Sequence, residues 1–183
     1  MESLAGHLLI AVPELPDSNF FRSVVLLLQH SEEGASGVVL NRPSDVSVSQ
    51  VWEEISEEAC LSNLLVNVGG PVEGPLIGLH SSLALGEVQI LSGLFMSLRR
   101  ENLNQLVMQD VHPFRIYSGY AGWGPMQLDS EIERGGWLTM RAEYDHVFES
   151  PEGLWKRVCE HVGHNIMLPH FGIKSLPNDP SMN

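Results

Sequence analysis

The sequence has few cationic side chains, with 10 Lys and Arg against 23 Asp and Glu, which gives a formal net charge of −13. The shortage is greatest before residue 99, where Arg22 and Arg42 are the only cations. Contacts from Lys and Arg to phosphates supply most non-specific affinity for nucleic acids. Direct nucleic-acid binding is therefore not expected. The alternative requires a local basic groove built from cations of the second half: Arg99, Arg100, Arg115, Arg141, Lys156 and Arg157.

Long apolar runs and cysteines are also scarce. No stretch approaches the roughly 20 apolar residues of a membrane span. The first residues carry Glu2 and no cation before Arg22, so they are not predicted to be a signal peptide. Cys60 and Cys159 could form one disulfide, but nothing else indicates an oxidising compartment. We therefore expect a cytoplasmic protein that does not associate with membranes.

Signatures of common catalytic sites are missing, including a phosphate loop, a dinucleotide-binding glycine fingerprint, a nucleophile elbow and a His-Glu-x-x-His zinc motif. Asp17, Ser23 and His30 supply the residue types of a hydrolase triad. Seven residues along one strand would separate Ser23 from His30 by more than about 20 Å and place them on opposite faces. These two side chains are therefore not expected to form a nucleophile–base pair.

One group of metal-ligand residue types occurs near the end of the chain, in CEHVGHNIMLPH. Cys159, His161, His164 and His170 fall in this segment, which reads as part of a helix. At about 100° per residue, Cys159 and His161 point about 200° apart, and His164 lies nearly opposite the buried face. A single ion cannot take ligands from both sides of a helix, so neither a metal ion nor a cofactor is predicted.

Strands with interspersed helices predict an α+β domain over residues 1–175, with a mixed or antiparallel sheet, followed by a loose tail over 176–183. Strands are expected at 7–13, 23–30, 37–41, 65–69, 76–80, 87–91, 94–97, 114–120 and 137–144. Helices are expected near 47–59, 99–109, 125–134 and 151–163. The early strands are continuously apolar rather than alternating, which indicates burial on both faces.

The stretch GYAGWGPMQLDSEIE, from Gly119 to Glu133, can be interpreted in two ways. In the first, glycines let a strand turn sharply into a helix that starts at Pro125, and Tyr120 and Trp123 fill the floor of the turn. In the second, the same aromatic side chains form the walls of a site for a small ligand or peptide, with free N–H groups at the helix start as donors. The residues alone leave both interpretations open.

Three blocks together resemble the AlgH/YqgE family of bacterial proteins: GHLLIAVPELPDSNFFRSVVLLLQH with GASGVVLNRP, then GGPV at 69–72, then GYAGWGPMQLDSEI with WL. The resemblance spans nearly the whole chain. It implies an α+β fold with a sheet curled into a pseudo-barrel and flanking helices. Members have no established activity and are often labelled transcriptional regulators. The family usually has glycine where this chain has Met126, so a ligand that needs close backbone approach there would be obstructed.

The favoured functional hypothesis is a non-enzymatic cytoplasmic protein that binds a small ligand or a protein partner and could serve regulation. Its candidate binding residues, chosen from the family blocks and the polar ends of apolar strands, are Arg22, His30, Asn41, Arg42, Gly119, Tyr120, Trp123 and Gln127. The alternative is a hydrolase with a polar site near Arg22, His30, Asn41 and Arg42. A further alternative gives the two arginines structural ion pairs with Asp17, Glu32 or Asp45.

Overall fold

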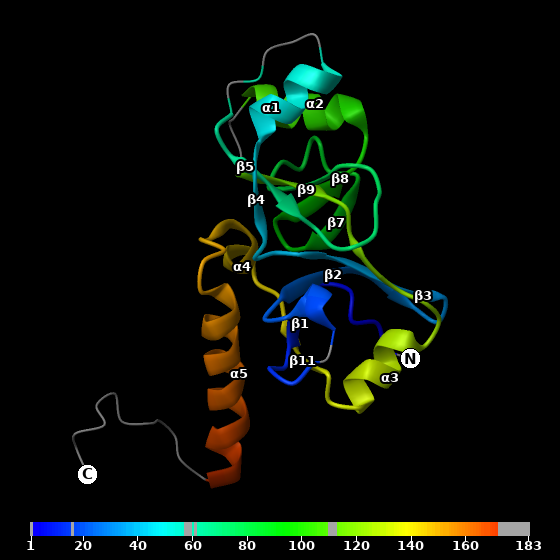
Figure 1. Ribbon diagram of the computed structural model, residues 1–183, viewed down its shortest axis with the longest axis vertical. Coiled ribbons are helices and arrows are strands. Elements are labelled where there is room, and N and C mark those ends of the chain that lie inside the picture. The colour runs from blue at the N-terminus through cyan, green and yellow to red at the C-terminus, as the bar shows by residue number, and fades with distance from the viewer. Residues whose placement is uncertain (1, 16, 57–59, 61, 110–112, 172–183) are drawn as a thin grey trace, which may run out of the picture.

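The computed structural model describes residues 2–15, 17–56, 60, 62–109 and 113–171, with 164–171 described as backbone only. The strands form two sheets, placed one after the other along the long axis of the molecule (Figure 1). The five-stranded sheet has the order β10-β3-β2-β1-β11, and all of its pairs are antiparallel. In that order its strands are Ala121–Trp123, Gly34–Val39, Val24–Ser31, His7–Ala11 and Trp137–Arg141.

The six-stranded sheet has the order β4-β5-β9-β6-β8-β7 and is mixed, because β5 and β9 are parallel while its other pairs are antiparallel. In that order its strands are Pro43–Ser47, Leu65–Val68, Phe114–Ser118, Ile77–His80, Leu94–Ser97 and Val88–Leu91. The α+β prediction is confirmed. The strands divide into two sheets, and neither closes into a barrel within the described residues.

The division arises where β3 gives way to β4. Leu40 still donates its N–H to Val24 in the five-stranded sheet, whereas the carbonyl of Arg42 accepts from Val68 in the six-stranded sheet, 2.8 Å in each case. Pro43 follows and has no N–H to donate, so it cannot extend the β2–β3 ladder. Val39 also donates to the carbonyl of Gly69 at 2.8 Å, which joins the two sheets at this point.

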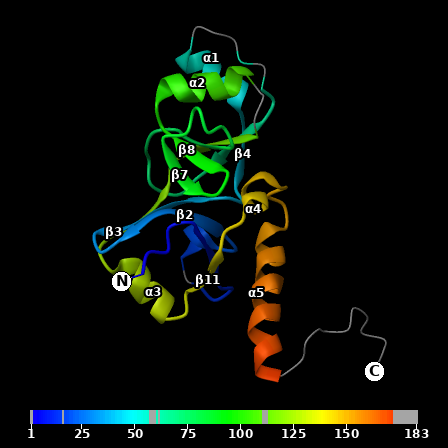
Figure 2. The same cartoon turned by 180° about the vertical axis from the view of Figure 1, so that it is seen from behind.

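The helices cover the two ends and one side of this pair of sheets. Helices α1 (Val48–Ile55) and α2 (Arg100–Gln109) lie over the outer end of the six-stranded sheet, and α3 (Gln127–Glu133) covers the opposite end of the molecule (Figures 1 and 2). Helices α4 (Tyr144–Phe148) and α5 (Leu154–Phe171) run along the side. A short 3-10 turn, η1, spans Ser18–Phe20 before β2.

Both faces of the five-stranded sheet are buried along β1 and most of β2, as the continuous apolar strands predicted. In β1, Leu8 and Ile10 belong to the core between the sheets and α5, whereas Leu9 and Ala11 belong to a second core beneath α3. Leu128 of α3 is 1% exposed and packs into that second core. A third core lies between α1, α2 and the six-stranded sheet. The second core is the one that positions the candidate site.

Element boundaries were predicted best where the signal is local. The capping box of α1 is present: Ser47 accepts from Gln50 N–H at 3.2 Å, and the Gln50 side chain accepts from Ser47 N–H at 2.8 Å. The predicted extension of this helix over 57–59 lies outside the described residues, as does the predicted tail. The turn between β2 and β3 is shorter than predicted, because β3 already begins at Gly34.

Several boundary predictions were wrong, and three of them have a local physical reason. Helix α3 begins at Gln127 rather than Pro125, because Met126 takes a left-handed conformation that no right-handed helix can include. The last helix begins at Leu154 rather than Pro151, since Gly153 has a positive φ of 70° and ends a turn there. The predicted strand 137–144 ends at Arg141, and Tyr144 already starts α4, a helix that the sequence patterns did not indicate.

Candidate functional site

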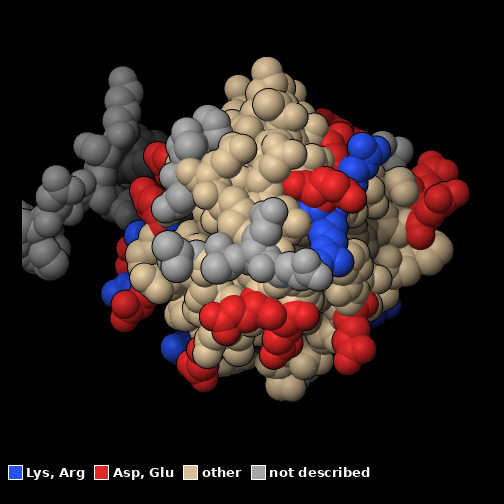
Figure 3. All heavy atoms as spheres, turned by 90° about the horizontal axis from the view of Figure 1, so that it is seen from above, with Lys and Arg blue, Asp and Glu red and all other residues tan. Residues whose placement is uncertain are grey.

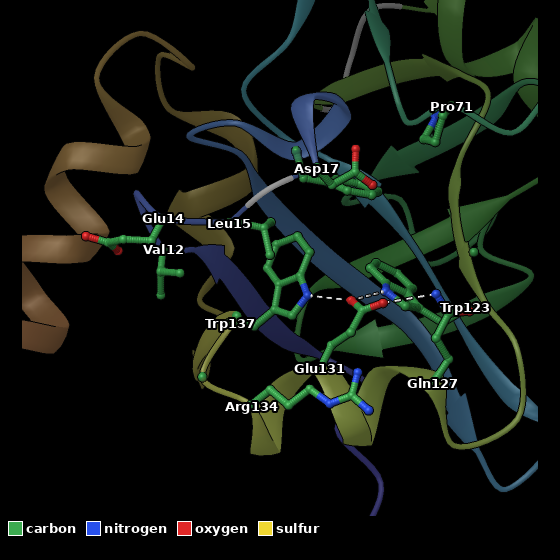
Figure 4. Close-up of a pocket in the computed structure, with 14 residues that line it drawn as sticks. Val12, Glu14, Leu15, Asp17, Pro71, Trp123, Gln127, Glu131, Arg134 and Trp137 are labelled. Atoms are coloured by element: carbon green, nitrogen blue, oxygen red, sulfur yellow. Dashed lines mark hydrogen bonds between the residues drawn. The ribbon is translucent and has the colours of Figure 1, made fainter.

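A pocket of about 550 Å³ opens beside α3, at the end of the molecule away from α1 and α2 (Figure 4). The pocket is lined by the loop after β1, by η1, by the 68–74 segment, by β10, by α3 and the turn after it, and by the start of β11. The lining residues are Val12, Glu14, Leu15, Asp17, Phe20, Pro71, Gly122, Trp123, Gln127, Glu131, Arg134, Gly135, Gly136 and Trp137. This volume falls within the usual range for small-ligand sites.

Three aromatic rings form the floor of the pocket. Phe20 stacks on Trp123 with ring centroids 5.8 Å apart, and Trp137 meets Phe20 and Trp123 edge-on at 5.4 and 6.0 Å. The rings are 8%, 6% and 3% exposed, because they also pack into the core beneath α3. Such offset and edge-on pairs are worth about 0.5–1.5 kcal/mol beyond the area they bury. The floor is therefore rigid and is held by the fold rather than by a ligand.

The carboxylate of Glu131 joins the aromatic floor to α3. Its Oε2 accepts hydrogen bonds from the indole N–H groups of Trp123 and Trp137, at 3.0 and 2.9 Å, and its Oε1 accepts from the Gln127 amide at 2.9 Å (Figure 4). Gln127 in turn accepts from the N–H of Gly124 at 3.0 Å. We call Trp123, Gln127, Glu131 and Trp137 the Glu131 cluster. It contains one formal charge and three neutral donors.

The start of α3 explains why these groups meet. Met126 has φ 57° and ψ 4°, so it turns the chain into the helix without supplying a side-chain cap, and Gln127 caps Gly124 instead. The Met126 side chain is 52% exposed and does not line the pocket. Glycine adopts such a left-handed backbone without the strain that a residue with a side chain carries. The Met126 side chain does not line this pocket, so it does not obstruct a ligand there.

The ionisable rim of the pocket is predominantly acidic. Glu14, Asp17 and Glu131 are its carboxylates and Arg134 is its one cation. Among the described residues, no Lys, Arg or His nitrogen lies within 4.0 Å of the Glu131 carboxylate. Arg42 lies outside the pocket but interacts electrostatically with Asp17, one of the lining carboxylates. Burial lowers the pKa of Arg42, and the negative charge of Asp17 opposes that shift.

The structure separates the predicted site residues into groups. Trp123 and Gln127 line the pocket, while Gly119 lines a neighbouring hollow of about 430 Å³ formed with the 68–74 segment. Tyr120 pairs with Val72 through two backbone hydrogen bonds of 2.9 and 3.0 Å. Gly119 is needed for its backbone, with φ 72° and the carbonyl of Val72 at 2.8 Å from where a Cβ would lie. Gly119 and Tyr120 therefore lie outside the pocket lining.

The polar residues near the start of β2 have structural contacts. The Asn41 amide accepts from Val24 N–H and donates to the Arg22 carbonyl, both at 2.9 Å, and so fixes the left-handed Arg22 at φ 50°. The Arg22 guanidinium lies over the rings of Phe21 and Trp155, at 5.1 and 5.4 Å. Arg42 donates weakly to the Phe21 carbonyl at 3.5 Å, and none of the described carboxylates comes within ion-pair distance of it.

His30 lies at the other end of β2 and is 8% exposed. Its Nδ1 accepts from Leu4 N–H at 3.0 Å, which places the proton of a neutral ring on Nε2. That Nε2 is 3.5 Å from Asp129 Oδ2 on α3. His30 thereby connects the N-terminal segment, β2 and α3. Seven residues, six of them in β2, separate it from Arg22, so the predicted set of Arg22, His30, Asn41 and Arg42 does not converge on one site.

The positions of the described serine and histidine side chains do not support the hydrolase alternative. Ser23 donates to the Phe20 carbonyl at 2.8 Å and is fully buried. A different serine–histidine pair exists in the six-stranded sheet, where His80 Nε2 lies 2.9 Å from Ser97 Oγ. Both residues are 0% exposed, and Ser97 Oγ donates to the Leu85 carbonyl at 2.5 Å. A substrate cannot reach this hydroxyl in the folded protein.

The other sequence candidates are dispersed. Cys159 is half-buried, with its pKa raised by burial, while His161 is exposed on the same helix; the side chains of His164 and His170 lie outside the described part. No cluster of three or more potential metal ligands occurs among the described residues. Both cysteines are free thiols. None of the described helices is long and apolar enough to cross a membrane.

The cations proposed for the alternative basic groove lie in different parts of the fold, and two of them bond to backbone carbonyls. Arg115 donates to the carbonyls of Val147, Phe148 and Glu149, and Arg157 donates to those of Ser150 and Glu152. Arg100 begins α2 at the far end of the molecule, where acidic side chains are more prominent than basic ones (Figure 3). Arg115 and Arg157 therefore hold the segment that joins α4 to α5, and they do not form a groove with Arg100.

Sequence reasoning missed Phe20, Trp137 and above all Glu131 as site residues, and Glu131 is the one with a local signal. The local signal was its i,i+4 spacing from Gln127, which put both on one polar stripe of α3. The positions of Trp123 and Trp137 in the sequence, 8 residues before and 6 residues after Glu131, did not indicate that both indoles contact it. The two indoles come together only when β10 and β11 take their places at the two edges of one sheet. A glutamate between two tryptophans in sequence could have suggested the arrangement, but many exposed helix positions share that pattern.

Comparison with known proteins gives consistent matches over the whole chain. The sequence profile of the AlgH-like family, DUF179, matches residues 8–167. A UPF0301 protein of Myxococcus xanthus is 39% identical over 169 residues, covering 89% of this chain and 93% of that protein. A UPF0301 protein of Streptomyces coelicolor is 36% identical over 195 residues, covering 100% and 97%.

Two solved structures have the same fold. The solution structure of AlgH from Pseudomonas aeruginosa superposes with a TM-score of 0.74 at 29% identity, covering 97% of this chain and 96% of that one. The crystal structure of a protein from Corynebacterium diphtheriae gives a TM-score of 0.70 at 28% identity, covering 88% of each chain. The names of these relatives state neither a ligand nor a reaction.

Proposed function

The chain belongs to the AlgH-like family, and from that premise we propose that it is a non-enzymatic cytoplasmic binding protein whose pocket beside α3 takes a cationic ligand. The observation that carries the proposal is the Glu131 carboxylate, which faces the pocket and has no cation among the described residues within 4.0 Å. A regulatory role would follow if ligand occupancy controlled a partner. The two free thiols agree with a reducing compartment.

The first support is hydrogen-bond capacity. An ionised carboxylate has about four acceptor positions. Trp123 and Trp137 use two on Oε2, and Gln127 uses one on Oε1. One position on Oε1 is left for a ligand donor. Hydrogen bonds between a charged acceptor and a cationic donor are about twice as strong as neutral ones, so an ammonium or guanidinium group is the fitting occupant.

The second support is the charge of the surroundings. Glu14 and Asp17 add negative charge at the rim, and the whole chain carries −13. A half-buried carboxylate attracts a cation more strongly than an exposed one because the local dielectric constant is lower. The same charges repel phosphates and carboxylates. An anionic ligand would have to rely on Arg134 alone among the lining residues.

The third support is the lining chemistry. Phe20, Trp123 and Trp137 offer an apolar surface for the carbon skeleton of a ligand. None of the 14 lining residues is serine, cysteine, histidine or lysine. The described lining therefore offers no hydroxyl, thiol or imidazole for the hydrolase alternative. Binding without covalent chemistry is the function these groups support best.

The proposal is tested by titrating isotopically labelled protein with butylguanidinium and following the indole N–H signals of Trp123 and Trp137. We expect saturable shifts of both signals, and Glu131→Gln should weaken binding about tenfold or more because the charge-assisted hydrogen bond is lost. Glu133→Gln is the matched control, since Glu133 is an exposed carboxylate on the same helix that does not line the pocket.

Pentanoate serves as the anionic probe of the same chain length and should leave both signals unchanged. Equal binding of pentanoate, or equal weakening by Glu131→Gln and Glu133→Gln, would show that the pocket does not select cations through Glu131. Absence of any shift with millimolar butylguanidinium would remove the proposed function.

A further inference from the structure

We infer that the ligand of this pocket is an extended, positively charged peptide segment, which pairs through its backbone with the open edge of β10 at Gly122. The inference rests on the proposed function and adds the chemical class of the ligand. It comes from a backbone feature, the free edge of a strand, that is independent of the Glu131 carboxylate.

Strand β10 lies at the edge of the five-stranded sheet and pairs only with β3. The N–H and C=O of Tyr120 both bond to Val72, on the side away from β3. Along a strand, successive residues direct their backbone polar groups to alternate sides. The groups of Ala121 and Trp123 therefore face β3, and those of Gly122 face away from it, toward the pocket that Gly122 lines.

The neighbouring edge positions are already occupied. Val72 pairs with Tyr120, and the residue that would continue this antiparallel pairing to Gly122 is Gly70, to which no hydrogen bond from Gly122 runs. On the other side, the N–H of Gly124 is bonded to the Gln127 side chain at 3.0 Å. One donor and one acceptor thus stay open at Gly122, which matches the two backbone hydrogen bonds of a single peptide residue in an antiparallel pair.

Glycine keeps this edge accessible. A Cβ at position 122 would lie 3.3 Å from the Tyr120 ring, within a tight but tolerable contact, and the residue is exposed. The φ of Gly122 is not positive, so the strand does not require glycine for its conformation. The absence of a side chain leaves room for another backbone to approach.

The carboxylates of the pocket favour peptides with cationic side chains. A residue paired with Gly122 lies beside a pocket whose carboxylates are Asp17, Glu14 and Glu131. In an added strand, alternate side chains point to the same face, so a lysine or arginine next to the paired residue can extend toward Glu131 while its alkyl stem crosses the aromatic floor. A peptide with acidic residues would meet the same carboxylates and be repelled.

A small free cation would satisfy Glu131 without using Gly122, and the experiment separates the two. The probes are a library of end-capped pentapeptides with arginine at the centre and mixed residues elsewhere, the same library N-methylated at each backbone amide, and butylguanidinium. Binding is followed by the amide signal of Gly122 and the indole signals of Trp123 and Trp137.

Gly122→Pro removes the outward N–H, and because that group takes no part in the sheet, an edge proline is tolerated there. Gly122→Ala is the matched control, which adds the side-chain carbon and keeps the N–H. We expect Gly122→Pro to weaken peptide binding about tenfold relative to the butylguanidinium affinity of the same variant, and Gly122→Ala to change that ratio less than about threefold. The N-methylated library should bind no better than butylguanidinium.

The outcomes are distinct. If the peptides bind the wild type and both Gly122 variants equally, or fail to bind while butylguanidinium binds, the peptide inference is overturned and the proposed function stands. If neither the peptides nor butylguanidinium shift the reporter signals, both are overturned. Loss of all binding in Gly122→Ala together with a changed amide spectrum would assign Gly122 a purely structural role and also overturn the inference.

Discussion

Two polar clusters lie next to aromatic rings in this protein, and they differ in access. In the Glu131 cluster a carboxylate accepts from Trp123 and Trp137 at the wall of a pocket. In the other, His80 and Ser97 bond to each other beside the ring of Phe95, with both residues fully buried. The residue types of the second cluster are those of catalysis, yet only the first can meet a ligand. The two clusters therefore differ more in exposure than in their suitability for chemistry.

The largest loss of stability is expected at the aromatic floor of the pocket, beside the Glu131 cluster. We expect Trp137→Ala to lower the free energy of unfolding by about 3–5 kcal/mol, because it removes a buried ring and leaves a cavity beneath α3. Trp137→Phe keeps a ring and loses the N–H donated to Glu131, so it should cost only about 1–2 kcal/mol. Urea unfolding measures both. Equal losses would mean that the hydrogen bond, rather than the ring, holds this cluster together.

The closed cluster should affect stability without affecting binding. Ser97→Ala deprives the His80 ring and the Leu85 carbonyl of a hydrogen-bond partner in a fully buried position, which should cost about 1–3 kcal/mol. Its affinity for butylguanidinium should equal that of the wild type, measured at a temperature where both are folded. A selective loss of binding in Ser97→Ala would connect the two clusters and remove the contrast between them.

The smallest effect is expected at Met126, where the backbone is strained at the start of α3. A left-handed residue other than glycine costs roughly 1–2 kcal/mol, and glycine adds roughly 0.5–1 kcal/mol of unfolded-chain entropy. Met126→Gly should therefore stabilise the protein by up to about 1 kcal/mol in thermal unfolding. Met126→Ala, which keeps the strain and removes the exposed side chain, should give no gain. A gain in both variants would place the cost in the side chain.

Local patterns predicted part of the candidate site. Trp123 and Gln127 belong to the stretch that the sequence singled out, and both line the pocket. Arg22, Asn41 and Arg42 were grouped with His30 because they border apolar strands, but strand β2 holds the groups at its two ends. A sequence gives the spacing along a strand, whereas the direction of each polar end depends on what packs over it, here Trp155 at one end and α3 at the other.

The sequence by itself determined the α+β class, the start of α1 through Ser47 and Gln50, and the burial of both faces of β1 and β2, because each depends on residues within one turn or one strand. Only the tertiary structure decided that the strands form two sheets, and that Glu131 lies between Trp123 and Trp137. The physical reason is distance along the chain. Hydrogen bonds from β10 and β11 can meet on one carboxylate only after the intervening sheet and α3 have packed, and no local propensity encodes that meeting.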